Sequence, residues 1–382
     1  MDRRLFLAAA LGALVAPRLR AQTTPAPVTR WNVTGSEGFD ALAFLGPLSG
    51  ETLYRDYYAA DADAFALKLP EAIRADIPKL WKESGDGGFG LLGPSLSTVL
   101  SGADVATLDG VIAALGDLEG RVRPAYQVSP YYDPKDWAWL NAAAPRLRAV
   151  TSAMRAADFT GFRATRTAGL QARCGEIGRA LVPYDVVRLQ RKFTGRDFDP
   201  TINVVLVQFA KPHGIKVQGQ TFLQSPDYDV ATTVRIAAHE MLHPPVPMDG
   251  PTAKAALALL AKDPLIPRIV KEHDPRWGYT TLEGYLNEDL CQALDQLISE
   301  ALGMARNPAD RWRLSDDGMH VLAAGLYGML RQDKWIQTGG SIEAWLGKAV
   351  ESGRIAPANL HPVAARVLER PADHLWPLPP AA

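Results

Sequence analysis

The chain has 382 residues, of which 47% are hydrophobic and 22% are charged, and its formal net charge is -1. This is the composition of a globular protein with enough apolar side chains for a large core. A chain so close to neutrality lacks the basic footprint of nucleic-acid binding, so we expect no nucleic-acid partner.

The opening segment, residues 1–21, resembles a twin-arginine export signal, because Arg3 and Arg4 directly precede the apolar stretch from Leu5 to Val15. That stretch is too short to be a stable membrane anchor, and no later segment is long and apolar enough to cross a bilayer. The residues before Ala21 are an imperfect cleavage site for a signal peptidase. The alternative is that the segment is not removed and tethers the protein to the membrane. We expect a periplasmic or secreted protein whose oligomeric state the sequence does not define.

Residues 22–195 predict an N-terminal helical region that serves as scaffold. Apolar residues recur at helical spacing in several of its segments, which include residues 71–83, 104–118, 133–157 and 169–181. Aromatic side chains such as Trp137 and Phe159 are expected in the core of this region.

The pattern changes near Phe193, where strand signals begin. Residues 202–209 form a continuous apolar run rich in β-branched side chains, which is typical of a buried strand. After the turn signal at 211–214, residues 215–224 alternate polar and apolar side chains. This alternation predicts a half-exposed strand at or near a sheet edge.

The next predicted helix carries the sequence His239-Glu240-Met241-Leu242-His243, which reads H-E-x-x-H. Two imidazoles four residues apart project from one helical face and can bind one metal ion, with Glu240 beside them as a base. The alternative is a surface helix that carries two histidines by chance.

Local signals define both ends of this helix. Asp229, or Ser225 slightly earlier, can cap the N-terminus with a side-chain oxygen. The prolines from Pro244 onward stop the helix. Because a residue before proline is pushed away from helical angles, we expect His243 at the last helical position. Ile236 falls on the same side as the histidines and should form an apolar wall or contact another element.

Downstream, residues 252–260 predict a short helix, residues 263–278 look irregular, and residues 280–303 predict a long helix. The apolar stripe of the long helix comprises Leu286, Leu290, Ala293, Leu294, Leu297 and Ala301. Its opposite face carries Glu288, Gln292, Asp295 and Ser299. A polar face is usually solvated, but here it is also where a third metal ligand would lie.

A catalytic zinc site needs three protein ligands and one open position. The segment Tyr285-Leu286-Asn287-Glu288 resembles the Leu-Asn-Glu segment of gluzincin aminopeptidases and the Asn-Glu ligand motif of thermolysin-like enzymes. Together with the H-E-x-x-H motif, it makes residues 200–300 similar to a gluzincin metallopeptidase, and we expect a poorly characterised bacterial H-E-x-x-H family rather than a particular gluzincin subfamily. The resemblance implies that His239, His243 and Glu288 hold Zn²⁺ and that peptide bonds are hydrolysed.

Two positions are open to alternatives. Glu283 competes with Glu288, although one helix cannot aim both at a single ion, and the continuous polar face favours Glu288. Thermolysin-like enzymes place a carboxylate one turn after the ligand glutamate to orient a metal-binding histidine. Gln292 stands at that position, and its amide oxygen can accept the same imidazole N–H.

The expected fold is α+β and mostly helical. A zincin-like catalytic region, residues 196–310, would contain a small β-sheet that precedes the H-E-x-x-H helix, and a C-terminal helical region, residues 311–382, would complete the cleft. Zinc peptidases hold an extended substrate on the strand before the metal helix, but a strand that merely faces water fits residues 215–224 equally well.

The expected reaction is hydrolysis of a peptide or protein substrate. Zinc would acidify a water and polarise the scissile carbonyl, and Glu240 would take the proton and pass it to the leaving amine. The candidates for stabilising the oxyanion, which the sequence does not rank, are Tyr285, His273, His320 and Tyr327. The alternative is a non-catalytic periplasmic binding or assembly protein with a structural zinc site.

Only two cysteines are present, Cys174 and Cys291. In an oxidising compartment they could form a disulfide, but two buried thiols fit the sequence as well.

Overall fold

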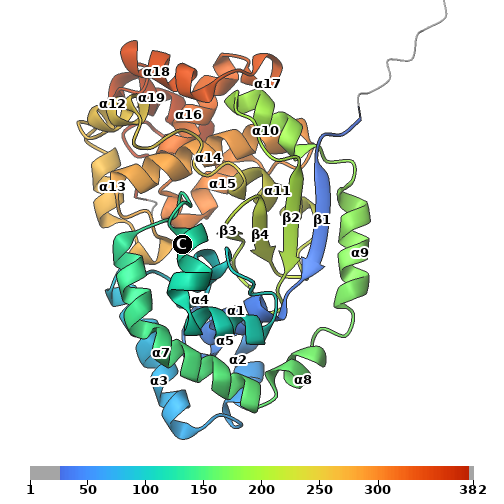
Figure 1. The fold of residues 1–382 in the computed structure, drawn as a ribbon. Helices are drawn as coiled ribbons and strands as arrows, with labels where there is room; N and C mark the ends of the chain where they lie inside the picture. The colour runs from blue at the N-terminus through green and yellow to red at the C-terminus, as the bar shows by residue number, and fades with distance from the viewer. Residues whose placement is uncertain (1–25, 378–382) are drawn as a thin grey trace, which may run out of the picture.

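The computed structural model describes residues 26–377 and has the expected α+β fold, which is mostly helical with one small four-stranded sheet (Figure 1). The predicted signal peptide, residues 1–21, lies outside the described residues. No helix within residues 26–377 is both long and apolar enough to cross a bilayer.

The sheet has the strand order β1-β2-β4-β3. Its strands are β1 (Arg30–Gly35), β2 (Thr201–Leu206), β3 (Ile215–Val217) and β4 (Thr221–Gln224). The pairs β1–β2 and β2–β4 are parallel, whereas β3 runs antiparallel to β4. Strand β1 was not predicted from the sequence, because its partner lies far along the chain, with Arg30 opposite Thr201.

The prediction of one strand over residues 215–224 is wrong. Gln218, Gly219 and Gln220 form a turn, and β3 and β4 pair with each other as a hairpin. Gly219 has a φ of 70°, a left-handed conformation that glycine adopts without steric cost. The alternating pattern does not distinguish one long strand from two short ones. The edge position expected for this segment is confirmed for β3.

Strand β2 separates two hydrophobic cores. Ile202, Val204 and Leu206 face one core, whereas Val205 and Val207 face the other. Because successive side chains of a strand point to opposite faces, a strand covered on both sides reads as one continuous apolar run.

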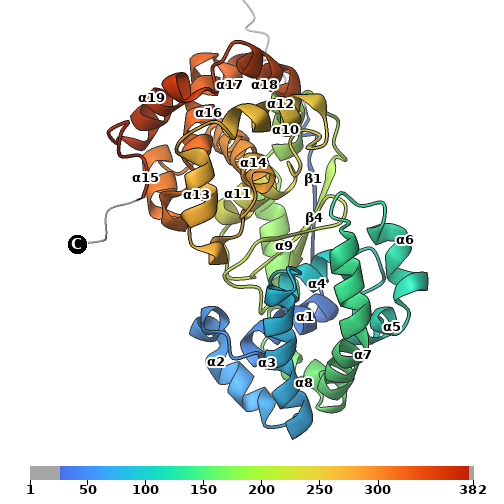
Figure 2. The ribbon, with the colours of Figure 1, turned by 90° about the vertical axis from the view of Figure 1, so that its left-hand side faces the viewer.

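The helices that share a core with Val205 cover one face of the sheet (Figure 2). They are α1 (Glu37–Leu48), α2 (Thr52–Ala66), α3 (Glu71–Asp86), α4 (Leu92–Leu100), α5 (Leu108–Gly116), a π-helix (Leu118–Val122), α6 (Arg123–Tyr126), α7 (Pro134–Ala156) and α8 (Phe159–Ala164). Trp137 and Phe159 are buried in this core, as predicted.

The remaining helices build the second core on the opposite face. They are α9 (Leu170–Leu181), α10 (Val186–Thr194), α11 (Val230–Glu240), α12 (Pro251–Leu260), α13 (Ile266–Glu272), a 3-10 helix (Pro275–Trp277), α14 (Leu282–Ala301), α15 (Pro308–Leu314), a second 3-10 helix (Asp316–Gly318), α16 (Val321–Gln332), α17 (Trp335–Thr338), α18 (Ile342–Glu351) and α19 (Pro357–Leu368). The expectation that residues 263–278 are irregular is wrong, because α13 lies within them.

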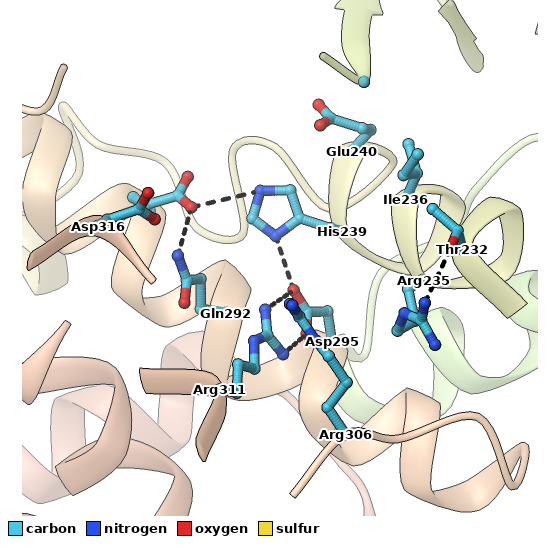
Figure 3. Close-up of a pocket in the computed structure, with 12 residues that line it drawn as sticks. Thr232, Arg235, Ile236, His239, Glu240, Gln292, Asp295, Arg306, Arg311 and Asp316 are labelled. Atoms are coloured by element: carbon cyan, nitrogen blue, oxygen red, sulfur yellow. Dashed lines mark hydrogen bonds and ion pairs between the residues drawn. The ribbon is translucent and has the colours of Figure 1, made fainter. Parts of the chain in front are cut away.

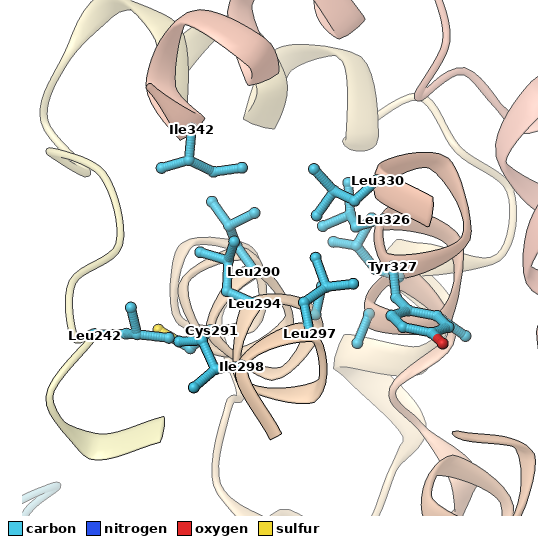
Figure 4. Packing of buried hydrophobic residues seen from close by; sticks show 14 of the residues in the cluster. Leu242, Leu290, Cys291, Leu294, Leu297, Ile298, Leu326, Tyr327, Leu330 and Ile342 are labelled. Atoms are coloured by element: carbon cyan, nitrogen blue, oxygen red, sulfur yellow. The ribbon is translucent and has the colours of Figure 1, made fainter. Parts of the chain in front are cut away.

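Helix α14 is the central element of the second core. Its predicted apolar stripe is buried from Leu286 to Leu297, and it packs against Leu326 and Leu330 of α16 and Ile342 of α18 (Figure 4). Its polar residues Glu288, Gln292, Asp295 and Ser299 are buried as well. The helix is therefore enclosed on both faces. Other side chains hydrogen-bond to Glu288, Gln292 and Asp295, whereas Oγ of Ser299 has no partner within the described residues.

Candidate metal centre

Helix α11 carries His239 and Glu240 at its C-terminal end. Asp229 caps its N-terminus, as predicted, by accepting a hydrogen bond of 2.7 Å from the backbone N–H of Thr232. At the other end, Gln190 of α10 donates to the carbonyl oxygen of Ala237 over 3.2 Å. The same oxygen accepts a longer bond of 3.4 Å from the backbone N–H of Met241, so Gln190 reinforces the last turn of the helix.

The helix ends earlier than predicted. Its last residue is Glu240, Met241 is the C-cap, and His243 lies beyond the helix in the turn that leads to Pro244. A proline lacks the backbone N–H needed to continue the ladder and clashes with the preceding turn, so the helix ends ahead of it. His243 still faces His239, since their ring centroids are 4.8 Å apart.

Three groups of the predicted ligand set converge. Nε2 of His239 lies 3.1 Å from Nε2 of His243, and these two atoms lie 3.5 Å and 3.4 Å from Oε1 and Oε2 of Glu288 respectively. Glu283 is exposed in the first turn of α14 and takes no part in this cluster. The three-residue set His239, His243 and Glu288 is also the group of potential ligands that lies close enough together for one ion.

The spacing of these atoms fits a tetrahedral metal ion. Ligand atoms bound at about 2.1 Å from tetrahedral zinc are separated from one another by about 3.4 Å. The two imidazole nitrogens lie near this distance from each other, and each lies near it from a different oxygen of Glu288. Two neutral imidazoles and one carboxylate also match the nitrogen and oxygen ligands that zinc accepts.

Electrostatics favours a cation at this point. Burial alone would raise the pKa of Glu288, but the two imidazoles beside it hold that pKa well below its usual value. Burial alone would lower the pKa of His239, whereas Glu288 and Asp295 raise it well above normal. The buried carboxylates therefore stabilise positive charge between them.

Asp295 orients His239, a role that the sequence analysis did not assign. Its Oδ2 lies 2.7 Å from Nδ1 of His239, and because a carboxylate accepts, Nδ1 is the protonated nitrogen in the neutral imidazole, the form whose Nε2 lone pair can bind a metal. Arg311 of α15 pairs with Asp295 in turn, with Nη2 at 2.9 Å from Oδ2. Burial would raise the pKa of Asp295, but Arg311 and His239 hold it below its usual value.

Gln292 does not accept a hydrogen bond from a histidine of the cluster, so that prediction is wrong. Its amide oxygen accepts from Nε1 of the buried Trp312 over 2.7 Å, and its amide nitrogen donates to Oε1 of Glu288 over 2.9 Å. The amide thus fixes the carboxylate of the third ligand rather than an imidazole.

Two cavities flank the cluster. One, of about 490 Å³, is lined by His239, Glu240 and Glu288 among others (Figure 3). The other, of about 580 Å³, is lined by His243, Met241 and Tyr131 among others. Residues of the cluster thus line both cavities.

Glu240 and Ile236 both line the first cavity. Burial raises the pKa of Glu240, while His239 and His243 oppose this shift. Ile236 forms an apolar wall of the cavity, which was one of its two predicted roles. It also packs closely against Gly214, since a Cβ added to that glycine would lie 2.9 Å from Cγ2 of Ile236.

Two phenols near the cluster were not predicted. Tyr279 lies near Glu288, and burial with the charges of Glu288 and Glu240 raises its pKa well above normal. The hydroxyl of Tyr131 is buried without a hydrogen-bond partner among the described residues, and burial and Glu240 raise its pKa. Both phenols therefore stay protonated and can donate.

The four side chains expected to stabilise an oxyanion have partners elsewhere. Tyr285 donates to the carbonyl oxygen of Met319, and Tyr327 donates to Glu300. His273 contacts the carbonyl oxygens of Ile269 and Gly278, and His320 contacts Asp289 at 2.6 Å. These contacts are structural, and His320 reaches the cluster only through Gln292, 3.0 Å away.

The outer edge of β3 is already covered. Thr98 of α4 donates to the carbonyl oxygen of Lys216 over 2.9 Å, and the N–H of Gln218 donates to Ser101 over 3.0 Å. These contacts favour the alternative in which the strand does not pair with an extended substrate there. The segment instead contributes side chains, because Lys216 and Gln218 line the second cavity.

The cysteines are both buried and free, so the structure contains no disulfide between them. Cys174 belongs to α9, whereas the Sγ of Cys291 lies 3.4 Å from Nδ1 of His243. Cys291 thus contacts the ring nitrogen opposite to the one that faces His239.

Compared with known proteins, the chain matches no family model, no curated sequence and no solved structure.

Proposed function

We propose that the protein is a zinc-dependent peptidase. The observation that carries this proposal is the convergence of His239, His243 and Glu288 at distances that suit a tetrahedral ion, with Glu240 on the wall of the adjoining cavity. The H-E-x-x-H motif and the Asn-Glu segment support the same reading, as does the hydrogen bond from His239 to Asp295.

Each side chain then has a defined task. When bound, zinc would supply Lewis acidity toward a carbonyl and lower the pKa of water. Glu240 accepts the proton of the attacking water and returns it to the leaving amine. Asp295 keeps the Nδ1–H tautomer of His239, and Gln292 fixes the carboxylate of Glu288.

Two phenols are the donors best placed for a developing oxyanion. Tyr279 lies against the ligand Glu288, and it has a left-handed backbone with a φ of 56°. A non-glycine residue in that conformation costs of order 1 kcal/mol, and such strain clusters at functional sites. Tyr131 lines the second cavity, and its buried hydroxyl has no hydrogen-bond partner within residues 26–377.

The rival function is a binding or assembly protein with a structural zinc. Structural sites use four protein ligands, whereas three potential ligands gather here among the described residues. Cys291 is not a fourth, because it contacts Nδ1 of His243 and not the nitrogen that faces the cluster. Three ligands next to two cavities favour catalysis.

The test of the proposed function is metal analysis of the purified mature chain combined with digestion of a peptide library. We expect one zinc per chain and cleavage that a chelator abolishes and added zinc restores. Stoichiometric zinc without cleavage of any peptide would favour the structural alternative.

We also propose export through the twin-arginine route, which rests on Arg3 and Arg4. Changing both to Lys should leave the precursor in the cytoplasm, as fractionation would detect. Unchanged export would instead indicate the general secretory route.

A further inference from the structure

Three arginines line the cavity that holds His239 and Glu240. Arg235 comes from α11, Arg306 from the loop after α14, and Arg311 from α15. Figure 3 draws all three on the same side of His239, around and beyond Asp295. Since they come from three separate elements, the fold itself gathers this positive charge beside the candidate metal centre.

The three guanidinium groups differ in their partners. Arg311 is committed to Asp295 as an ion pair. Arg235 donates only to neutral oxygens, namely Oγ1 of Thr232 at 2.9 Å and the carbonyl oxygen of Met304 at 3.3 Å. The guanidinium of Arg306 has no ion pair or hydrogen bond within the part of the chain that the structure describes.

The carboxylates of this cavity do not neutralise the two remaining arginines. Glu288 faces the two imidazoles, Asp295 is shared by His239 and Arg311, and Asp316 lies 3.1 Å from Nε2 of His320. The fourth carboxylate, Glu240, forms no ion pair with Arg235 or Arg306. Arg306 is partly withdrawn from water, and this burial together with repulsion from Arg311 and Arg235 lowers its pKa. The group still stays protonated, so an anion placed between these guanidinium groups would be stabilised.

The backbone that carries Arg306 is held in place. Gln296 of α14 donates to the carbonyl oxygen of Arg306 over 2.9 Å, and the N–H of Met304 donates to the carbonyl oxygen of Ser299 over 2.8 Å. Arg235 projects from the same helix as His239, one turn earlier. The backbone of both arginines is thus fixed relative to the candidate ligands, as a specificity subsite requires.

We propose that Arg235 and Arg306 form a subsite that binds a carboxylate of the substrate next to the scissile bond. This inference rests on the proposed function and narrows its substrate class to peptides with an anionic group on the His239 side of the centre. The carboxylate can come from an acidic side chain or from a free C-terminus, since both present the same two oxygens to a guanidinium fork.

The experiment uses three fluorescent peptides that share one neutral core. The first has an amidated C-terminus and no charge, the second has a free C-terminus, and the third is amidated but carries one Glu. Binding to the zinc-loaded Glu240→Gln protein is measured by fluorescence anisotropy, and cleavage of the same peptides is measured with the wild type. The binding measurement does not depend on turnover.

We expect one of the two anionic peptides to bind about ten-fold or more tightly than the neutral one. Preference for the free C-terminus identifies a terminal carboxylate, and preference for Glu identifies an acidic side chain. Adding Arg306→Gln or Arg235→Gln should remove the preference, so that the anionic peptides bind no more tightly than the neutral one. Arg74→Gln, an exposed arginine on α3, is the matched control and should keep the preference.

Equal binding of all three peptides would overturn the subsite, and so would a charge preference that survives both arginine substitutions. Arg306 is exposed enough for its Gln variant to fold, and zinc content checks that the centre is intact. A charge preference that depends on the arginines but comes without cleavage by the wild type would keep the subsite and reject the peptidase. Cleavage without a charge preference would instead keep the peptidase proposal and reject the subsite.

Discussion

Nδ1 of His239 lies 2.7 Å from Oδ2 of Asp295, so a carboxylate two turns beyond Glu288 on α14 orients the first histidine of the H-E-x-x-H motif. Hydrogen bonds of this kind fix the imidazole tautomer and raise the basicity of the ligand nitrogen. Asp295 is buried, and Arg311 keeps it ionised.

Replacing Asp295 with Asn should therefore weaken zinc binding by about ten- to a hundred-fold, because the amide cannot supply the same negative charge to the imidazole N–H. Zinc affinity is measured by competition with a chelator of known affinity. Asp310→Asn on the exposed face of α15 is the control. Equal affinity in the wild type and Asp295→Asn would show that Asp295 does not tune the site.

The two glutamates at the start of α14 should behave differently. Glu288→Gln is expected to lose stoichiometric zinc, since it removes the carboxylate that faces both imidazoles, whereas Glu283→Gln should bind zinc like the wild type because Glu283 is exposed. Metal content after gel filtration compares the two variants. Zinc loss in Glu283→Gln with retention in Glu288→Gln would reverse the assignment.

Tyr279→Phe should retain zinc and lower kcat by about a hundred-fold or more, as removal of an oxyanion donor does in other hydrolases. The loss should fall on kcat rather than on KM, because the donor acts on charge that develops in the transition state. Tyr327→Phe, whose hydroxyl is bonded to Glu300, is the matched control. If Tyr131→Phe lowers kcat while Tyr279→Phe does not, the oxyanion donor is Tyr131.

Asp185 makes the attachment of the N-terminal strand dependent on pH. It accepts hydrogen bonds of 2.9 Å from the backbone of Val28 and Thr29 and one of 2.6 Å from Arg188. Burial would raise the pKa of this carboxyl, but these bonds lower it to about 2. A folded-state pKa below the unfolded value stabilises the protein above about pH 4, and this contribution is lost as the pH falls toward 2.

Asp185→Asn should consequently reduce the free energy of unfolding by about 2 kcal/mol near neutral pH. The difference from the wild type should shrink as the pH drops below about 4, because the wild-type carboxyl becomes protonated too. Urea unfolding of both proteins across this range provides the measurement. A difference that is independent of pH would contradict the role given to the ionised carboxylate.

The parts of the centre that the sequence predicted are those encoded locally. His239, Glu240 and His243 lie within five residues, and Glu288 could be identified because a neighbouring Asn and the helical period of α14 mark its face. The same period predicted that Asp295 lies on that face. It could not predict that Asp295 meets His239, since this contact depends on how α11 packs against α14.

The missed features depend on long-range contacts. Tyr131 reaches the centre from the N-terminal helices, and β1 pairs with a strand far along the chain. Neither Tyr131 nor β1 is marked by a diagnostic local sequence pattern, because single tyrosines and short half-exposed strands occur in many structural settings. The hairpin of β3 and β4 was missed because the alternation continues through the turn at Gly219.

The most direct test of the peptidase proposal is peptide cleavage and zinc content measured side by side for the wild type and Glu240→Gln. The substitution keeps the size of the side chain but removes its proton acceptor, and Glu240 is not one of the three clustered ligands. We predict unchanged zinc and a loss of about a hundred- to ten-thousand-fold in turnover. Equal cleavage by the two proteins would contradict the mechanism.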